Sequence, residues 1–128
     1  MKSVQKRICL YHAESSVWPL MDIYETDGEL VFEIDLPGVG PEDVSVTADG
    51  DVLILEGIVK YGESDAGLKY ICMERGTRGF RRVIKFPVPV NVSEGTASCG
   101  RGVISVRFPK LERRAIAITV KKEIEDKE

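Results

Sequence analysis

The sequence is poor in the residues that most catalytic and metal-binding sites need. It contains one histidine, His12, and three scattered cysteines, Cys9, Cys72 and Cys99. An odd number of widely separated cysteines does not build a disulfide scaffold and suits a reducing cytosol. No stretch approaches the roughly 20 apolar residues that span a membrane, and residues 1–18 lack the continuous apolar core of a signal peptide. We therefore expect a soluble, cytoplasmic protein.

Net charge is also small. Charged residues make up 30% of the chain, yet the formal net charge is only −3, which gives no electrostatic reason for binding nucleic acid or an anionic membrane. One local basic cluster exists at Arg75, Arg78, Arg81 and Arg82, with Glu74 beside it. A solvated or interfacial strand face explains this cluster better than a nucleic-acid contact. We expect neither nucleic acid nor membrane as a partner.

Short motifs with catalytic or ligand-binding associations are weak here. His12 lies in a polar segment that offers a His-based triad no rigid frame, and Cys9-x-x-His12 supplies only two metal ligands. Gly38-x-Gly40 is followed by Pro41–Asp43, whose carboxylates repel phosphate. The segment Asp49–Asp51 is better explained as a turn than as a metal site. We expect no enzyme, no catalytic residue, no metal and no cofactor.

What the sequence does contain is a series of short strands, centred on residues 29–57. Leu30, Phe32, Ile34 and Leu36 alternate with charged residues, which predicts a strand with one buried and one solvated face that ends at Pro37. Val44–Ala48 alternates in the same way. Asp49–Asp51 predicts a type I′ hairpin turn into Val52–Leu55, whose unbroken apolar run is typical of a strand covered on both faces. Strands joined this tightly pair mostly antiparallel, so we expect an all-β sandwich.

Further strands are expected on either side of this centre. Pro19 favours an edge position for the strand that follows it, because proline cannot donate to a central ladder. The segment 68–73 is a candidate strand isolated between two loops, so it need not pair within its own sheet. The expected strands are Leu20–Tyr24, Leu68–Met73, Gly79–Pro87, Thr96–Cys99 and Val103–Phe108.

The C-terminal part carries a small apolar strand pattern between charged flanks. Ile116 to Val120 has apolar residues at every second position, preceded by Arg113 and Arg114 and followed by KKEIEDKE. This pattern is typical of a segment that docks into a groove or a sheet edge; the alternative is the last strand of its own sandwich. We divide the chain into an N-terminal arm (1–17), a β-sandwich domain (18–110) and a C-terminal extension (111–128).

Four segments together resemble the small heat shock proteins, the α-crystallin-domain family, in its bacterial and plant branch. Asp35–Gly57 resembles the family's leucine-proline-glycine turn followed by two strands. The other three are the Glu74–Pro87 segment, the Gly102–Lys110 segment with its Gly-Val-Ile sequence, and Ile116-Ala117-Ile118, which resembles the C-terminal Ile-x-Ile motif. The resemblance covers about Trp18 to Val120. Arg78 stands where the family usually has a small residue.

The resemblance implies an immunoglobulin-like antiparallel sandwich that forms a homodimer, either alone or within a higher homo-oligomer, and that holds non-native client proteins without ATP. It places Ile116 and Ile118 in a groove of a neighbouring subunit. The residues expected to line that groove are Val44, Val46, Ala48, Ala97 and Cys99.

A dimer interface is also implied by the resemblance, through a strand at 68–73 that reaches across to the partner's Leu20–Tyr24 edge; the alternative is a disordered loop. Alternation on the strand places Arg82 on the inward face, where a guanidinium needs a carboxylate from the same or the partner subunit, unless it reaches solvent at the sheet end. The expected interface residues are Leu20, Met21, Ile23, Tyr24, Tyr70, Ile71, Cys72, Met73 and Arg82.

A different class of function uses the same kind of sandwich. Scaffold or co-chaperone modules of the CS-domain type dock one native partner through a sheet face and do not need an Ile-x-Ile tail. The tail and the Gly-Val-Ile strand favour the chaperone interpretation.

Overall fold

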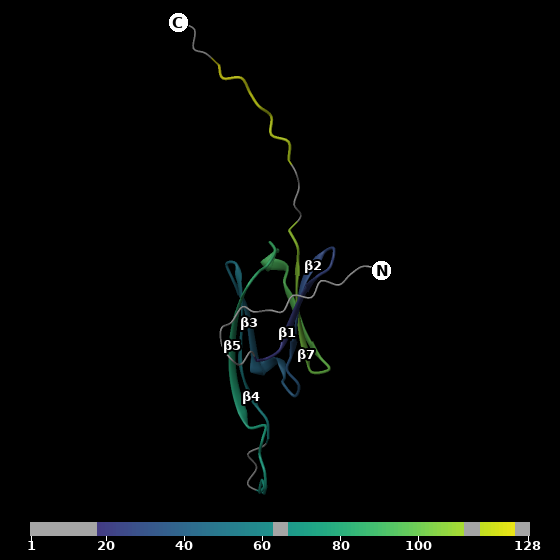
Figure 1. Cartoon of the computed structure of the whole chain (residues 1–128), viewed down its shortest axis with the longest axis vertical. Helices are drawn as coiled ribbons and strands as arrows, with labels where there is room; N and C mark the ends of the chain where they lie inside the picture. Colours follow the sequence, from purple (N-terminus) through teal and green to yellow (C-terminus); the bar gives the residue numbers. More distant parts are fainter. Residues whose placement is uncertain (1–17, 63–66, 112–115, 125–128) are drawn as a thin grey trace.

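The computed structural model describes residues 18–62, 67–111 and 116–124 as a two-layer β-sandwich followed by an extended tail (Figure 1). Strands and two short 3₁₀ helices follow one another along the described chain. In order they are β1 (Met21–Glu25), β2 (Glu29–Asp35), η1 (Pro41–Asp43), β3 (Val44–Asp49), β4 (Val52–Lys60), β5 (Thr77–Lys85), η2 (Val92–Glu94), β6 (Thr96–Gly100) and β7 (Val103–Pro109).

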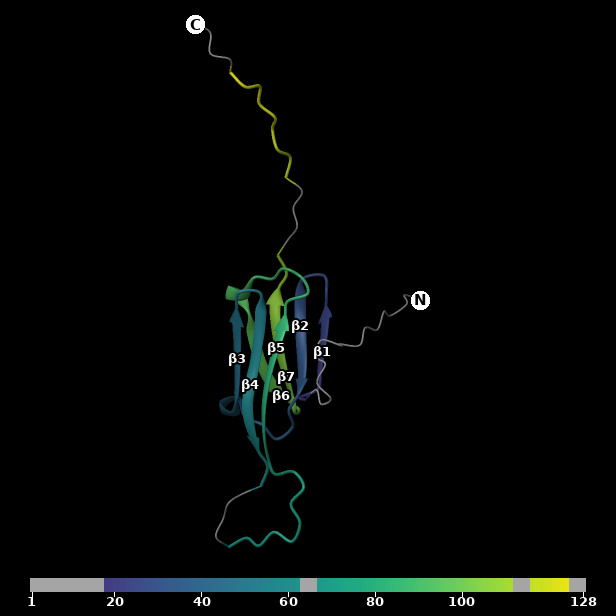
Figure 2. The same cartoon turned by 60° about the vertical axis from the view of Figure 1, so that its left-hand side comes forward.

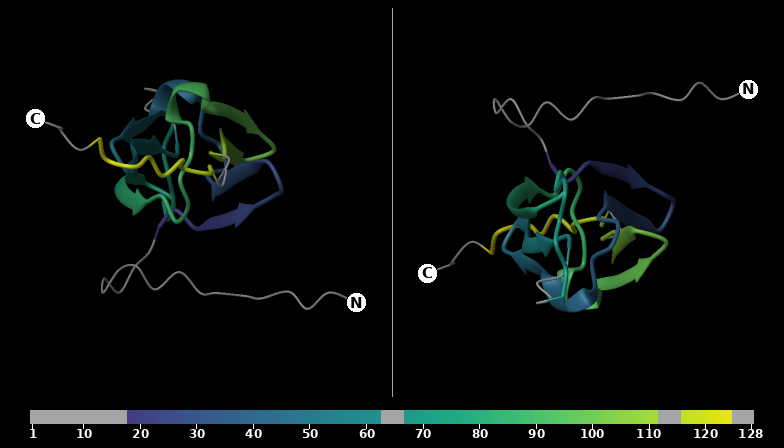
Figure 3. Two further views of the ribbon diagram at one scale, coloured as in Figure 1. Left: turned by 90° about the horizontal axis from the view of Figure 1, so that it is seen from above. Right: turned by 90° about the horizontal axis from the view of Figure 1, so that it is seen from below.

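Two antiparallel sheets make up the layers. One has the order β1-β2-β7-β6 and the other β3-β4-β5, and the end-on views show them facing each other (Figure 3). The predicted all-β antiparallel sandwich is thus confirmed. Each sheet leaves two edges, so β1 and β6 border the first sheet and β3 and β5 border the second.

The core lies between the sheets and consists of the inward residues of both. Phe32, Ile34, Leu53 and Leu55 are fully buried, as the alternation in β2 predicts. Phe32 contacts the rings of Phe86 and Phe108 edge to face, with both centroid distances at 6.1 Å. This aromatic group ties β2, β7 and the end of β5 together.

Two strands that are consecutive in the sequence belong to different sheets, and here the sequence interpretation needs correction. We expected the strands within residues 29–57 to pair with one another in order. β3 and β4 do pair, but β2 pairs with β1 and β7 instead. Gly38, at φ +76°, allows the reversal after Pro37, and the chain then crosses to the opposite sheet.

β4 is not covered on both faces as its unbroken apolar run suggested. Leu53 and Leu55 are buried, whereas Val52 and Ile54 on the outer face are only half-buried. The outer face of this three-stranded sheet has no further layer among the described residues, so the strand continues with ordinary alternation to Lys60.

The β3–β4 and β6–β7 hairpins both have two-residue turns, but the β3–β4 turn differs in type from the prediction. In the β3–β4 turn Asp49 pairs with Val52, and of the two turn residues only Gly50 has a positive φ. This matches a type II′ turn, with glycine first, rather than type I′. At the β6–β7 turn, by contrast, Arg101 and Gly102 both have positive φ (55° and 76°), as type I′ requires.

Two expected strands are absent from the described residues of the single chain. Leu68–Met73 has no strand hydrogen bonding and lies in the long loop between β4 and β5 (Figure 2). Ile116–Val120 is extended without sheet partners, so the alternative that made it the last strand of its own sandwich is wrong. The expected arm at 1–17 lies outside the described residues. No helix in the described ranges is long and apolar enough to cross a membrane.

Candidate functional site: the cleft between two sheet edges

An apolar cleft opens where the edge strands β3 and β6 face each other across the two sheets. Its walls alternate with the pleat of β3, whose inward residues Val44 and Val46 are half-buried and whose Ala48 is exposed. From β6 come Ala97 and Cys99, both exposed. The structure thus brings together the five residues expected to line a docking groove. We call this feature the β3–β6 groove.

Two cavities lie along this groove. The first, of about 270 Å³, is lined by Val44, Val46, Ala97 and Cys99, together with Pro41, Ser98 and Ile104. The second, of about 180 Å³, shares Val46 and Ala97 with the first and continues along Ala48, Thr96, Gly95 and Val92. The second cavity reaches Leu53, Val106 and Phe108 of the core, so an apolar side chain placed there would contact the packed interior directly.

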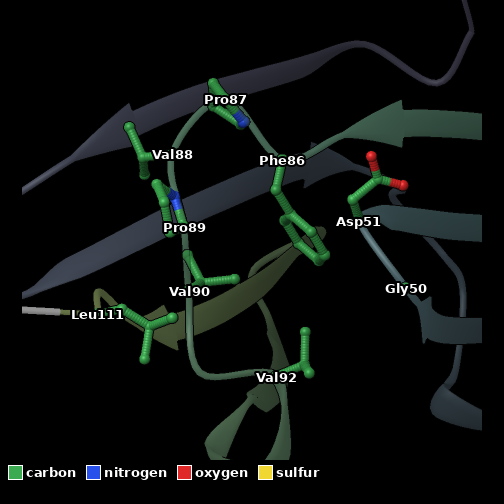
Figure 4. Close-up of a pocket in the computed structure, with 9 residues that line it drawn as sticks. All are labelled: Gly50, Asp51, Phe86, Pro87, Val88, Pro89, Val90, Val92 and Leu111. Carbon is green, nitrogen blue, oxygen red and sulfur yellow. The ribbon is translucent and has the colours of Figure 1, made fainter. Parts of the chain in front are cut away.

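A third cavity, of about 330 Å³, lies at the end of the sandwich from which the tail leaves (Figure 4). Phe86, Val88, Val90, Val92 and Leu111 give it apolar walls, and Gly50 and Asp51 of the β3–β4 turn complete it. Val92 lines both the second and the third cavity. The cavity therefore continues the β3–β6 groove past η2.

The tail itself leaves large apolar side chains in solvent. Ile116, Ile118 and Val120 are 79%, 87% and 94% exposed, and the segment leads away from both sheets (Figure 1). Exposed apolar residues at every second position are typical of an extended segment that binds a groove or a sheet edge. The structure does not bring these residues to the groove of their own chain.

On the opposite side of the sandwich, β1 and β5 enclose a buried arginine. Arg82 is 6% exposed, and its Nη1 donates a hydrogen bond of 2.8 Å to the carbonyl oxygen of Pro19. The alternation that placed Arg82 inward is correct, and the alternative in which its side chain reaches solvent does not fit this burial. A charged donor in this position fixes the start of β1 against β5.

The remaining arginines of the basic cluster each have a separate neighbour. Arg78 lies over the ring of Trp18 at 4.2 Å, Arg75 lies over Tyr61 at 5.4 Å, and Arg81 pairs with Glu56 at 3.6 Å. The cluster seen in the sequence is therefore distributed over aromatic and acidic neighbours along the sheet.

Apart from Arg82 on β5, the residues expected at the dimer interface fall into two groups that the single chain keeps apart. Leu20–Tyr24 lies at the free edge of β1, with Leu20 63% exposed. Tyr70–Met73 lies in the β4–β5 loop, which extends beyond the end of the sandwich (Figure 2). Ile71 in that loop is 100% exposed.

One titrating group on the β1 edge is perturbed. The Tyr24 hydroxyl donates a hydrogen bond of 2.7 Å to Glu33 Oε1. This hydrogen bond, with smaller contributions from desolvation and from the Glu33 charge, raises the pKa of Tyr24 above its ordinary value. Within the described ranges, no three His, Cys, Asp or Glu side chains come together in an arrangement that would hold a metal ion.

Sequence interpretation missed several residues that shape these sites. Val92 connects two cavities, and its signal was the alternation of Val88, Val90 and Val92 through a proline-containing linker. Trp18 packs edge to face on Phe80 at 5.5 Å, a contact between residues 62 apart that no local pattern indicates.

Comparisons with known proteins agree with this geometry. The family model described as the Hsp20/alpha crystallin family matches residues 22–125. The chain is similar to the 16.9 kDa class I heat shock protein 1 of Triticum aestivum, with 37% identity over 93 residues that cover 72% of this chain and 62% of that protein. It is also similar to small heat shock protein C2 of Rickettsia felis, with 28% identity over 100 residues that cover 78% and 65%. The chain thus spans somewhat less than two thirds of these relatives' own length.

Solved structures show the same arrangement. Heat shock protein 16.0 from Schizosaccharomyces pombe superposes with a TM-score of 0.65 and 26% identity, covering 84% of this chain and 100% of that one. A small heat-shock protein from Xylella fastidiosa, described as having a distinct high order structure, superposes with a TM-score of 0.63 and 30% identity over 84% and 96%. The chain therefore belongs to the Hsp20/alpha crystallin family, the small heat shock proteins.

Proposed function

We propose that this protein is an ATP-independent molecular chaperone that binds non-native proteins and limits their aggregation, working in the cytoplasm without catalysis. The observation that carries the proposal is the presence of two uncovered apolar surfaces, the β3–β6 groove and a tail whose isoleucines are largely exposed. A holdase needs apolar surface that is covered at rest and uncovered on demand. The groove and the tail are two such surfaces.

Ile116 and Ile118 would occupy the groove of a neighbouring subunit in the resting assembly. The tail adds an extended segment between two sheet edges, which is a common way for one chain to bind another. Release of the tail would expose both the groove and the isoleucines to a client, so assembly and client binding would compete for the same surface.

A light-scattering assay tests this function. The purified full-length chain is heated with a labile enzyme in the absence of ATP, and we expect it to suppress the scattering increase in proportion to its concentration. Undiminished scattering at molar excess would refute the holdase function. It would favour the CS-domain alternative, in which the sandwich docks one native partner.

Dimerisation through loop exchange is the second part of the proposal. The β4–β5 loop, with its fully exposed Ile71, would pair along the free edge of β1 in a partner and so cover two unsatisfied strand edges. We expect Ile71→Asp to shift the sedimentation coefficient toward that of a monomer. Ile58→Asp is the matched control, since Ile58 is 58% exposed on the outer face of β4 and is not part of the loop.

Arg82 would add an ion pair to this interface. It lies beside Pro19 at the start of the same β1 edge, so a carboxylate of the same or the partner subunit could meet it there. Removing one member of a buried ion pair costs about 3–5 kcal/mol, so we expect Arg82→Ala to weaken the dimer and lower its Tm. The neighbouring Arg81→Ala, which removes an exposed pair with Glu56, should change neither; an equally silent Arg82→Ala would contradict the interface role.

A further inference from the structure

The tail presents three apolar side chains at strand spacing. Ile116, Ile118 and Val120 follow one another at every second position, and Val120 is as exposed as the two isoleucines. In an extended chain alternate residues lie about 6.6 Å apart, so the three side chains span about 13 Å on one side of the segment. The next apolar residue, Ile124, falls four positions further on.

The β3–β6 groove continues through three cavities with the same spacing. Along β3 and the turn that follows, the first cavity is walled by Val44 and Val46, the second by Val46 and Ala48, and the third by Gly50. Successive cavities are thus about two residues apart along the chain. The apolar residues of the tail have the same two-residue spacing. Figure 4 shows Phe86, Val90 and Val92 in the third cavity with the Asp51 carboxylate at one side.

Charge complements this fit at both ends. At the first cavity Glu42 and Asp43 follow Pro41, which lines it, and the two acidic residues line a separate pocket together with Lys60. At the third cavity Asp49 and Asp51 lie on the β3–β4 turn. Asp51 Oδ2 forms an exposed ion pair with Lys85 Nζ at 3.7 Å.

The tail carries the opposite charge on both sides of its apolar segment. Its apolar residues are preceded by Arg113 and Arg114 and followed directly by Lys121 and Lys122. With the segment in the groove, a basic pair at either end would lie toward an acidic pair, whichever way the segment runs.

We propose that the β3–β6 groove provides three apolar binding sites, one at each cavity, for residues 116–120 of a second copy of this chain. Val120 occupies a site of its own, and Lys121–Lys122 lie next to the acidic residues at one end of the groove. This rests on the proposed docking of Ile116 and Ile118. It extends that docking by one apolar site and by the contact of Lys121–Lys122 with acidic residues, which we call the charge closure. Leu111 already lines the third cavity in its own chain, and the tail beyond leads away from the sandwich (Figure 1), which favours a second copy as the donor.

The first test compares Val120→Ser with the matched control Ile124→Ser in the full-length protein, by sedimentation velocity over a concentration series. Burial of a valine predicts that Val120→Ser raises the midpoint concentration of assembly about tenfold, while Ile124→Ser leaves it unchanged. Equal midpoints for the two variants would overturn the third site.

The double variant Ile116→Ser with Ile118→Ser separates this proposal from the docking on which it rests. If the double variant dissociates the assembly and Val120→Ser does not, only the third site fails. If the double variant is also silent, the proposed docking fails with it.

The charge closure is tested by Lys121→Glu with Lys122→Glu. Exposed pairs contribute little each, so we expect association to weaken about two- to fivefold at low ionic strength. The loss should shrink as salt is added, because screening weakens exposed pairs. A loss that does not depend on salt, or no loss at low salt, would overturn the charge closure.

Discussion

Gly57 on β4 is a position where a single added methyl group should disturb the sandwich. A Cβ at this residue would meet the carbonyl oxygen of Asp43 and would lie 2.9 Å from Cζ of the Phe80 ring. The carbonyl belongs to η1, whose Pro41 lines the first cavity of the β3–β6 groove. The ring packs on Trp18. Neither neighbour can move without disturbing a second contact.

Gly79 on the adjacent strand provides the matched control. It lies in regular strand, and a Cβ there would have the carbonyl oxygen of Gly57 at 3.8 Å as its closest neighbour. Replacing glycine by alanine without strain stabilises a protein by about 0.4–1 kcal/mol, because the unfolded chain loses freedom. Overpacking a filled site costs about 1–3 kcal/mol. We therefore expect Gly79→Ala to be neutral or stabilising, and Gly57→Ala to be less stable than Gly79→Ala by about 2–3 kcal/mol.

Urea unfolding at one fixed protein concentration measures this difference, since association shifts apparent stability with concentration. In a thermal scan the same difference corresponds to roughly 10–20 °C between the two variants. Equal midpoints for Gly57→Ala and Gly79→Ala would refute the close approach of η1 and Phe80 to β4.

Three further predictions concern side chains away from the groove. Phe32→Ala, which removes a fully buried ring and its two edge-to-face contacts, should cost about 3–5 kcal/mol in urea unfolding; a cost below 1 kcal/mol would contradict the aromatic core. Arg78→Ala should change the native fluorescence of the single tryptophan, Trp18, because the guanidinium lies over its ring, and an unchanged spectrum would argue against that contact. Glu33→Gln should lower the pKa of Tyr24 toward its usual value near 10, measured by ultraviolet titration. Because the folded-state pKa is raised, the stabilising contribution of this hydrogen bond is complete below the unfolded pKa and is lost as pH rises through the folded one.

Local patterns were sufficient to predict most strands. Alternation in Leu30–Leu36 identified β2 and its buried face, and the same pattern placed Arg82 inward. The glycines at 100 and 102 identified the β6–β7 hairpin. These features depend on neighbours within a few residues, where the period of two and turn chemistry dominate.

Arrangement between sheets was harder to predict from the sequence. The reversal at Pro37–Gly38 has the chemistry of a tight hairpin, yet the chain crosses to the opposite sheet, because β2 has its second partner in β7, about 70 to 80 residues away. The half-exposed outer face of β4 is another such case, since an apolar run alone does not show whether a further layer covers it.

The residues of the candidate sites were also only partly predictable from the sequence. The family resemblance, not a local pattern, supplied the five expected groove residues, and the structure places those five along the same pair of cavities. The third cavity was not predicted, because it joins the β3–β4 turn, the proline-containing linker and Leu111, three segments with no shared pattern. Arg82 was placed on the correct face, but its acceptor, the carbonyl of Pro19, is a backbone atom 63 residues away.

The central claim is that the tail of one copy fills the β3–β6 groove of another, and disulfide trapping tests it most directly. Cys99 lines the first cavity, so Cys9→Ser with Cys72→Ser leaves one native thiol in the groove, to which a tail cysteine is added at Ile116, Val120 or Ile124. On mild oxidation we expect the Ile116→Cys or the Val120→Cys protein to form linked chains, and the Ile124→Cys protein to form none above background. Linkage confined within single chains, or no linkage beyond that of Ile124→Cys, would contradict the account.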